Sequence, residues 1–184
     1  GANNGASDNT AIGYEALLSN TSGSGNVAVG KDALYSNTTA SNNTAVGHDA
    51  LQANTTGTRN VSVGHHSLLN NTTADSNTAV GFEALSQATT GGVNTAFGTW
   101  ALQNNTTGHS NTAIGAAALA AATTAIDNVA VGRDSLYATT TGQYNTAVGT
   151  DSMLSNTTGA NNVAVGYQAL YTNTTGGSNT AIGE

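Results

Sequence analysis

The sequence predicts an all-β protein, a parallel β-solenoid with 17 residues in each coil. The first observation is that Asn recurs every 17 residues from Asn9 to Asn179 without a slip. The second is that this unit is shorter than those of helical-hairpin arrays and leucine-rich repeats, which leaves a solenoid coil. The third is that each unit carries a short alternating, β-branched segment between turn-forming Gly, Asn and Thr residues, a pattern typical of a strand bounded by corners.

Each unit reads N-[TV]-[AS]-[VIF]-G-x-x-[AS]-[LM]-x-x-[NAT]-T-[TS]-[GA]-x-x, and its residues are numbered as positions 1 to 17. Residues 1–8 form a partial leading coil, residues 9–178 form ten units, and residues 179–184 begin an eleventh. Gly always occupies position 5 and Thr position 13, while position 9 is Leu in every unit except the one with Met153.

Positions 1 to 5 predict a strand that ends at the Gly. Positions 6 to 11, for example residues 14–19, are interpreted as a second strand, although Glu, Ala and Leu there would also suit one helical turn. The remaining positions predict corners. Coils that stack at about 4.8 Å make a rod on the order of 50 Å long.

Stacking places identical residues in columns. The Asn residues at position 1, and those at position 12 in seven of ten units, predict amide ladders along the rod. The alternative is that Asn only suits the backbone of the turns. Thr at position 13 predicts a column of hydroxyl groups on a corner.

Two sets of apolar columns compete for the interior. Positions 2 and 4 share one face of the strand and position 3 takes the other, while Ala or Ser at position 8 lies beside Leu at position 9. If the small residues fill the interior, the Val and Leu columns face outward and need other chains to cover them. If the large residues are inside, a monomer is possible. About two large apolar residues in each coil are a small core, which favours the oligomer.

Composition excludes several classes of partner and chemistry. A net charge of −7, with three Lys plus Arg, argues against binding to nucleic acid or anionic lipid. Without Cys, the chain has no disulfide, thiolate nucleophile or Cys-based zinc site. No apolar run is long enough to span a bilayer. Because neither end resembles a cap, we expect part of a longer shaft or a unit that stacks end to end.

The segments N-T-A-V-G and N-V-A-V-G, with the following G-x-x-A-L, resemble S-V-A-I-G-x-x-S repeats in the head domains of trimeric autotransporter adhesins. They are still more similar to the N-T-A-I-G-Y-x-A-L-x-x-N-T-T-G arrays of bacteriophage tail-fibre proteins and large bacterial surface proteins. The resemblance extends from Asn9 to Glu184. It implies a trimeric, left-handed parallel β-roll that presents a binding surface outside the cell, on the cell surface or on a virion. The 17-residue unit is longer than the adhesin unit, which leaves the shape of the coil open.

Ionisable side chains give two candidate metal sites. Acidic residues gather at position 7, where they predict a solvated stripe or, as an alternative, calcium ligands. These residues are Glu15, Asp32, Asp49, Glu83, Asp134 and Asp151. His48 and His65 occupy position 6 on adjacent coils, with His66 next in sequence. We expect exposed histidines without a metal, and transition-metal binding is the alternative. The sequence thus predicts no metal, cofactor or catalytic site.

Aromatic residues and sequons give the remaining candidates. Tyrosines at positions 6 and 10 either stack on sugar rings or pack over the next coil; they are Tyr14, Tyr35, Tyr137, Tyr167 and Tyr171. Trp100 and the run from Ala116 to Ala122 break the pattern and suggest a contact patch. Sequons begin at Asn37, Asn54, Asn71, Asn105, Asn156 and Asn173, but they arise from composition, so glycosylation is a minor alternative.

The sequence therefore favours a non-catalytic structural shaft or adhesin segment. His66 and Ser67 are neighbours, but neighbours on a strand face opposite sides, and no third residue orients the imidazole. The competing functions are a self-assembling extracellular filament and an ice-binding solenoid. Adjacent Thr residues at positions 13 and 14 should face apart, which argues against an ice-binding face there.

Overall fold

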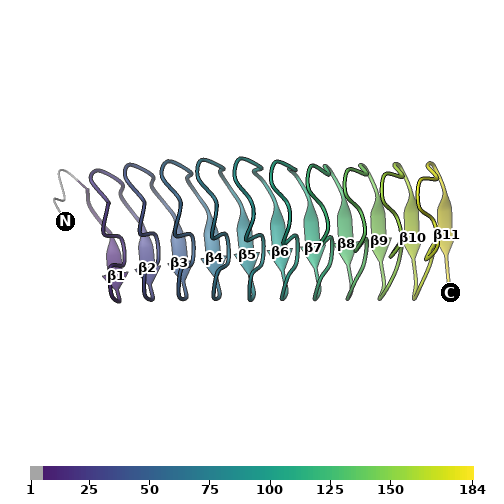
Figure 1. Ribbon diagram of the computed structural model, residues 1–184, viewed down its shortest axis with the longest axis horizontal. Helices are drawn as coiled ribbons and strands as arrows, with labels where there is room; N and C mark the ends of the chain where they lie inside the picture. The colour runs from purple at the N-terminus through teal and green to yellow at the C-terminus, as the bar shows by residue number, and fades with distance from the viewer. Residues whose placement is uncertain (1–5) are drawn as a thin grey trace.

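The computed structural model describes residues 6–184 and confirms a β-solenoid of about ten turns with 17 residues in each coil. The strands of the described residues lie side by side in chain order and form one parallel sheet, with β1 and β11 at opposite ends of a rod (Figure 1). Residues 1–5 of the predicted leading coil lie outside the described residues. Within residues 6–184 no helix is long and apolar enough to cross a membrane.

The strands are β1 Thr10–Ile12, β2 Val27–Val29, β3 Thr44–Val46, β4 Val61–Val63, β5 Thr78–Val80, β6 Thr95–Phe97, β7 Thr112–Ile114, β8 Val129–Val131, β9 Thr146–Val148, β10 Val163–Val165 and β11 Thr180–Ile182.

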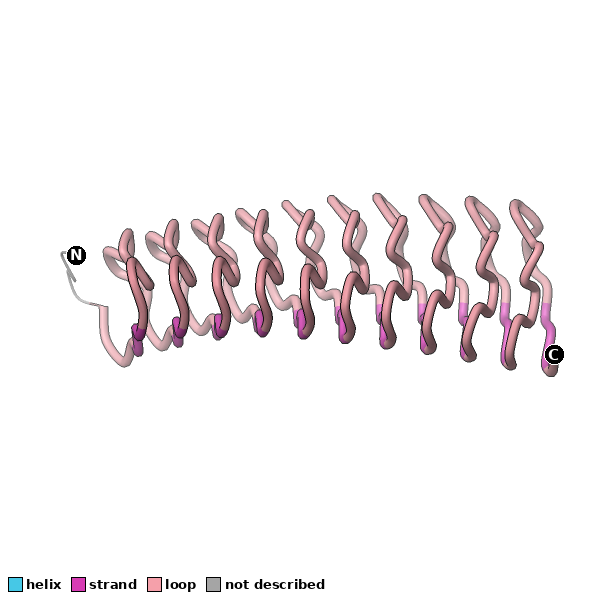
Figure 2. Tube along the Cα trace, turned by 60° about the horizontal axis from the view of Figure 1, so that its bottom comes forward, coloured by secondary structure: helices cyan, strands magenta, loops and turns pink. Residues whose placement is uncertain are grey.

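Each strand covers positions 2 to 4 and pairs with the same positions of the next coil. Thr10 lies opposite Val27, and the register never shifts along the rod. The Gly at position 5 ends the strand with a positive φ, +142° at Gly98, where a Cβ would lie 2.5 Å from the carbonyl oxygen of Gly115. Only Gly fits there, because a side chain would displace the neighbouring coil. The strands line one side of the rod and loops form the rest (Figure 2).

The second strand that we predicted over positions 6 to 11 is wrong. This segment consists of successive tight turns, in which the amide of Ala16 donates to Gly13 O, that of Leu18 to Glu15 O, and that of Asn20 to Leu17 O. The residues at positions 7 and 9 have φ near +55°, for example Glu15 at +54°. Because left-handed residues alternate with ordinary ones, the chain cannot extend, although its other amides still bond to adjacent coils.

Leu at position 9 holds an unfavourable backbone conformation. Leu85 has φ +52° and Leu102 has φ +51°, in a region that costs a non-glycine residue about 1 to 2 kcal/mol. Both side chains are fully buried. Burial of a Leu side chain contributes about 1.5 to 3 kcal/mol, which offsets the strain. The left-handed turn therefore persists because it directs Leu into the core.

The interior contains both small and large residues, so our assumption that only one set fits was wrong. Away from the two end coils, Ala or Ser at position 3, Ala or Ser at position 8 and Leu or Met at position 9 are all buried, as Ala79, Ala84 and Leu85 illustrate. The expectation that Leu faces outward is therefore incorrect. Turn geometry, rather than strand alternation, lets positions 8 and 9 both face inward. Of the columns that were expected to compete for the interior, those at positions 2 and 4 lie outside, where Val148 is 37% exposed.

Asn at position 1 forms the predicted column of amides. Asn9 Oδ1 accepts a hydrogen bond from the backbone amide of Asn26, at 2.9 Å, and Asn26 Oδ1 does the same for Asn43. The Nδ2 of Asn26 donates to the carbonyl of Ala40, at position 15 of its own coil, at 2.9 Å. Each buried amide therefore closes its own coil and bonds to the next one.

Direct amide-to-amide bonds along the position 1 column occur in the second half of the rod. The Nδ2 of Asn111 lies 3.1 Å from Asn94 Oδ1, and the same contact continues from Asn128 to Asn179. The ladder prediction is thus confirmed. Along the whole column, each Asn Oδ1 also accepts a hydrogen bond from the backbone amide of the position 1 Asn in the next coil.

Asn at position 12 forms a second amide ladder, which is interrupted. The Nδ2 of Asn54 donates to Asn37 Oδ1 at 3.1 Å, and that of Asn71 to Asn54 Oδ1 at 2.9 Å. The ladder stops at Ala88, and among the described residues Asn71 Oδ1 and Asn105 Oδ1 are buried without a hydrogen-bond partner. The unsatisfied Asn105 Oδ1 has the same cause, because position 12 of the next coil is Ala122, which has no side-chain amide to donate.

The Thr column at position 13 is confirmed and explains why Thr is invariant there. The hydroxyl of Thr38 donates to the carbonyl of Thr55 at 3.2 Å, and that of Thr55 to Thr72 at 3.0 Å. Equivalent bonds run from Thr21 to Thr174. Each hydroxyl thereby adds one side-chain bond to the backbone bonds between coils.

We predict that Ala88→Asn stabilises the rod. The new amide would donate to Asn71 Oδ1 and to the carbonyl of Gly91, and would accept from Asn105 Nδ2, in a site whose shape neighbouring coils share. Satisfying these buried groups should raise the free energy of unfolding by about 1 to 2 kcal/mol, measured by chemical denaturation. Ala116→Asn, on an exposed residue, is the control and should have little effect. A lower stability for Ala88→Asn would contradict the ladder interpretation.

Candidate functional site

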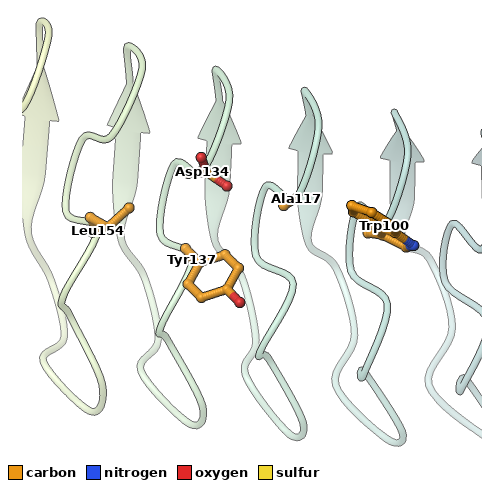
Figure 3. Close-up of a pocket in the computed structure, with 5 residues that line it drawn as sticks. All are labelled: Trp100, Ala117, Asp134, Tyr137 and Leu154. Atoms are coloured by element: carbon orange, nitrogen blue, oxygen red, sulfur yellow. The ribbon is translucent and has the colours of Figure 1, made fainter.

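A hollow of about 420 Å³ interrupts the regular surface at the turns of the sixth to ninth coils. We call it the notch, and it is lined by Trp100, Ala117, Asp134, Tyr137 and Leu154. Figure 3 shows the rings of Trp100 and Tyr137 on either side of Ala117. The notch is open to solvent, since Trp100 and Tyr137 are each 45% exposed.

The notch exists because the seventh coil has only Ala at positions 6, 7 and 10. Position 7 carries Trp100, Ala117 and Asp134 in three successive coils, so the small residue lies between two large ones. Position 10 repeats this arrangement, with Ala120 before Tyr137. Within the run from Ala116 to Ala122, Ala117 is thus the floor of the notch, and Trp100 is one wall. Two coil spacings give an opening of roughly 10 Å, enough for one sugar ring or one protein side chain.

Charges at one wall of the notch are paired. The carboxylate of Asp134 lies 2.7 Å from Arg133 Nη1, and Arg133 Nη2 lies 3.6 Å from Asp151 Oδ1. The guanidinium is largely exposed, so these ion pairs add little to stability. The wall therefore offers both a hydrogen-bond donor and an acceptor next to the aromatic rings.

The acidic column at position 7 is a set of local pairs. Asp32 pairs with Lys31 at 3.0 Å, and Glu83 accepts a hydrogen bond from Gln103 at 2.6 Å. The hydrogen bond from Lys31 to Asp32 raises the pKa of the lysine above its usual value. Likewise, a hydrogen bond to Glu15 raises the pKa of Tyr14. Within residues 6–184, three acidic side chains never converge on one point, which gives the calcium alternative no support.

The histidines converge more closely than the sequence indicated. His48, His65 and His66 each place a ring nitrogen within 4.8 Å of the others. The sequence suggested only that His48 and His65 are neighbours in one column. His66 joins them because the backbone at position 7 is left-handed. The residue types at this position do not predict that conformation.

Four of the five tyrosines at positions 6 and 10 are exposed, as stacking on sugar rings would require. Tyr14, Tyr137, Tyr167 and Tyr171 are exposed, and Tyr35 is half-buried. Sequence reasoning did not single out Val93, Phe97 or Tyr144, which are also exposed.

The sequons are poor sites for glycosylation in this fold. The asparagines Asn37, Asn54, Asn71, Asn105 and Asn156 are completely buried, and Asn173 is half-buried. Their amide nitrogens donate hydrogen bonds inside the coil, as Asn54 does to Gly57 O. A glycan at any of them would require the coil to open.

The neighbours His66 and Ser67 do not form a catalytic pair. The hydroxyl of Ser67 lies in the interior, 2.5 Å from Ser62 Oγ, and donates to Gly64 O. His66 is on the outer surface beside Asp49, at 3.3 Å. The two side chains lie on opposite sides of the coil, although the segment is a turn and not the strand from which this was predicted.

Comparisons with family models, curated proteins and solved structures give no match for this chain.

We predict that the single Trp reports on the notch. Trp100 should show the red-shifted emission of an exposed indole and strong quenching by acrylamide. Ala117→Leu should reduce the quenching constant by about half, because a larger side chain on the floor covers one face of the indole. Ala53→Leu, in the third coil, is the control and should leave quenching unchanged. Equal quenching in all three proteins would mean that Ala117 is not the floor beside Trp100.

Proposed function

We propose that the chain is a non-catalytic shaft segment of a fibrous protein outside the cell, on a cell surface or a virion. In this proposal the sheet face packs against other copies of the chain, and the notch and the exposed tyrosines at positions 6 and 10 contact a receptor. The resemblance to adhesin and tail-fibre repeats favours three copies. End-to-end stacking into a filament is the alternative assembly.

The observation that carries the proposal is the outer face of the sheet. Positions 2 and 4 form two parallel columns of Thr, Val, Ile and Phe that run the length of the rod, including Phe97 at 56% and Ile114 at 42% exposure. Position 4 is apolar in every described coil, and a continuous apolar column of this kind is unusual on an isolated soluble chain and typical of an interface. The 17-residue periodicity also supports self-association, because each coil of one copy can repeat the same contact with another.

The rod itself suits a mechanical role. Every coil is bonded to the next through the backbone, the position 1 amides and the position 13 hydroxyls. Each coil contacts chiefly its two neighbours, so stiffness extends along the axis without a large core. A rigid rod separates its two ends by a fixed distance, which is what a shaft must do.

The notch supports receptor contact. Exposed aromatic rings stack on the apolar faces of sugars, and the neighbouring Arg133 and Asp134 can bond to hydroxyl groups. A cell-surface glycan or a protein loop is therefore the proposed target. Glycan arrays and whole-cell binding test this with wild type and with Trp100→Ala, and Tyr144→Ala is the control. Undiminished binding by Trp100→Ala would remove the notch from the proposal.

Ice binding is the second candidate, and the same sheet face favours it. Thr at position 2 and Val at position 4, as in Thr44 and Val46, lie one residue apart on a flat outer surface. The Thr residues occur mainly in alternate coils, and Phe97 interrupts the surface, which makes this candidate weaker. Thermal hysteresis in a monomeric protein would favour it over the shaft.

We predict that the combined substitution of Val46, Val80 and Val148 by Asp disperses the assembly into monomers. All three side chains lie on the outer face, so the chain should stay folded while the charged groups prevent apolar contact. Light scattering measures the mass, negative-stain images distinguish trimer from filament, and circular dichroism checks the fold.

The matched control places three Asp residues on the same coils at position 14, replacing Thr56, Thr90 and Thr158. These residues are exposed on a different side of the coil and should leave the mass unchanged. If both triple variants and the wild type had the same mass, the sheet face would not be the interface.

A further inference from the structure

We propose that His48, His65 and His66, together with Asp49, bind one divalent transition-metal ion of the Zn²⁺ type. The four residues occupy positions 6 and 7 of the third and fourth coils and make a two-by-two array on the surface. The proposal is independent of the shaft function, because it concerns a different part of the rod from the notch and the sheet face.

The backbone explains why four neighbouring side chains converge. On a strand, consecutive side chains diverge to opposite faces. Here Asp49 has φ +55° and His66 has φ +57°, which turns the position 7 side chain to the same side as position 6. The rings of His65 and His66 consequently lie with their centroids 3.7 Å apart. The amide of His66 donates to His48 O at 3.1 Å and keeps the two coils in register.

The donor atoms are already close to one another. The three histidines each have a ring nitrogen within 4.8 Å of the others. Asp49 Oδ2 lies 3.0 Å from His48 Nδ1 and 3.3 Å from His66 Nε2. A tetrahedral ion binds imidazole nitrogen at about 2.0 to 2.1 Å, so small rotations of these partly exposed rings complete the site. The backbone beneath need not move.

Surrounding residues orient the donors. Gln52 Nε2 donates to Asp49 Oδ1 at 2.9 Å, which leaves Oδ2 facing the histidines. Phe82 stacks on His65 with 5.5 Å between the ring centroids and 6° between the planes. Partners of this kind fix ligand geometry in metal sites. Glu83, at position 7 of the next coil, adds negative potential that attracts a cation, whereas Lys31 offsets the charge of Asp32 at 3.0 Å.

The chemistry of the donors selects the type of ion. Three imidazoles and one carboxylate suit Zn²⁺, Cu²⁺ or Ni²⁺, whereas Ca²⁺ and Mg²⁺ require mostly oxygen ligands. The ion would cross-link two adjacent coils near one end of the rod. Because it would bind only the folded arrangement, it should also raise the unfolding temperature.

Calorimetric titration of the whole chain with ZnCl₂ tests the proposal. One ion should bind per chain, with affinity reduced about tenfold or more in His48→Ala and in His65→Ala. His109→Ala is the matched control, since His109 is exposed and contacts Ser110 at 3.3 Å, far along the rod. It should bind Zn²⁺ as the wild type does.

Spectroscopy with Co²⁺ gives a second measurement on the same variants. The wild type should show the intense visible bands of a four-coordinate, nitrogen-rich site, and His48→Ala and His65→Ala should lose them. The proposal is overturned if neither ion binds at one equivalent, if both alanine variants bind as tightly as the wild type, or if His109→Ala abolishes binding.

Discussion

The structure depends on the buried carboxamide at position 1. Its oxygen accepts a hydrogen bond from the backbone amide of the next position 1 Asn, and its nitrogen donates one to the carbonyl at position 15 of its own coil. Asn26 does this with Asn43 and Ala40. A buried amide without partners would cost about 1 to 3 kcal/mol, so each coil must place the next Asn directly above. This requirement sets the in-register stack, and the stack in turn aligns every other column.

The regular stack tolerates local strain because burial compensates for it. Residues at positions 7 and 9 adopt left-handed conformations in every described coil, although Leu, Trp and Glu do not favour them. At position 9 the compensation is a fully buried Leu. At position 7 the result is a side chain that lies beside its position 6 neighbour, which produces both the histidine array and the wall of the notch that Trp100 forms.

Functional features therefore arise from variation at exposed positions of a constant frame. Positions 1, 3, 5, 9 and 13 scarcely vary because each makes a contact that repeats along the axis. Most side chains at positions 6, 7 and 10 are at least partly exposed and these positions vary, so one coil can carry His65 and His66 while another carries only Ala116 and Ala117. The solenoid thus separates residues that build the rod from residues that give each part of its surface a different chemistry.

The sequence by itself determined the coil length, a strand within positions 1 to 5, the Gly corner and the Asn and Thr columns, because a periodicity of 17 residues can only be satisfied by stacking like upon like. It could not determine that residues 14–19 form turns or that Leu17 and its equivalents face inward. Those features depend on positive φ angles at residues such as Leu102, which local propensity opposes and only tertiary burial stabilises. The convergence of His66 with His48 has the same origin. Sequence spacing shows which residues share a column, whereas the direction of each side chain was decided by the packed coil.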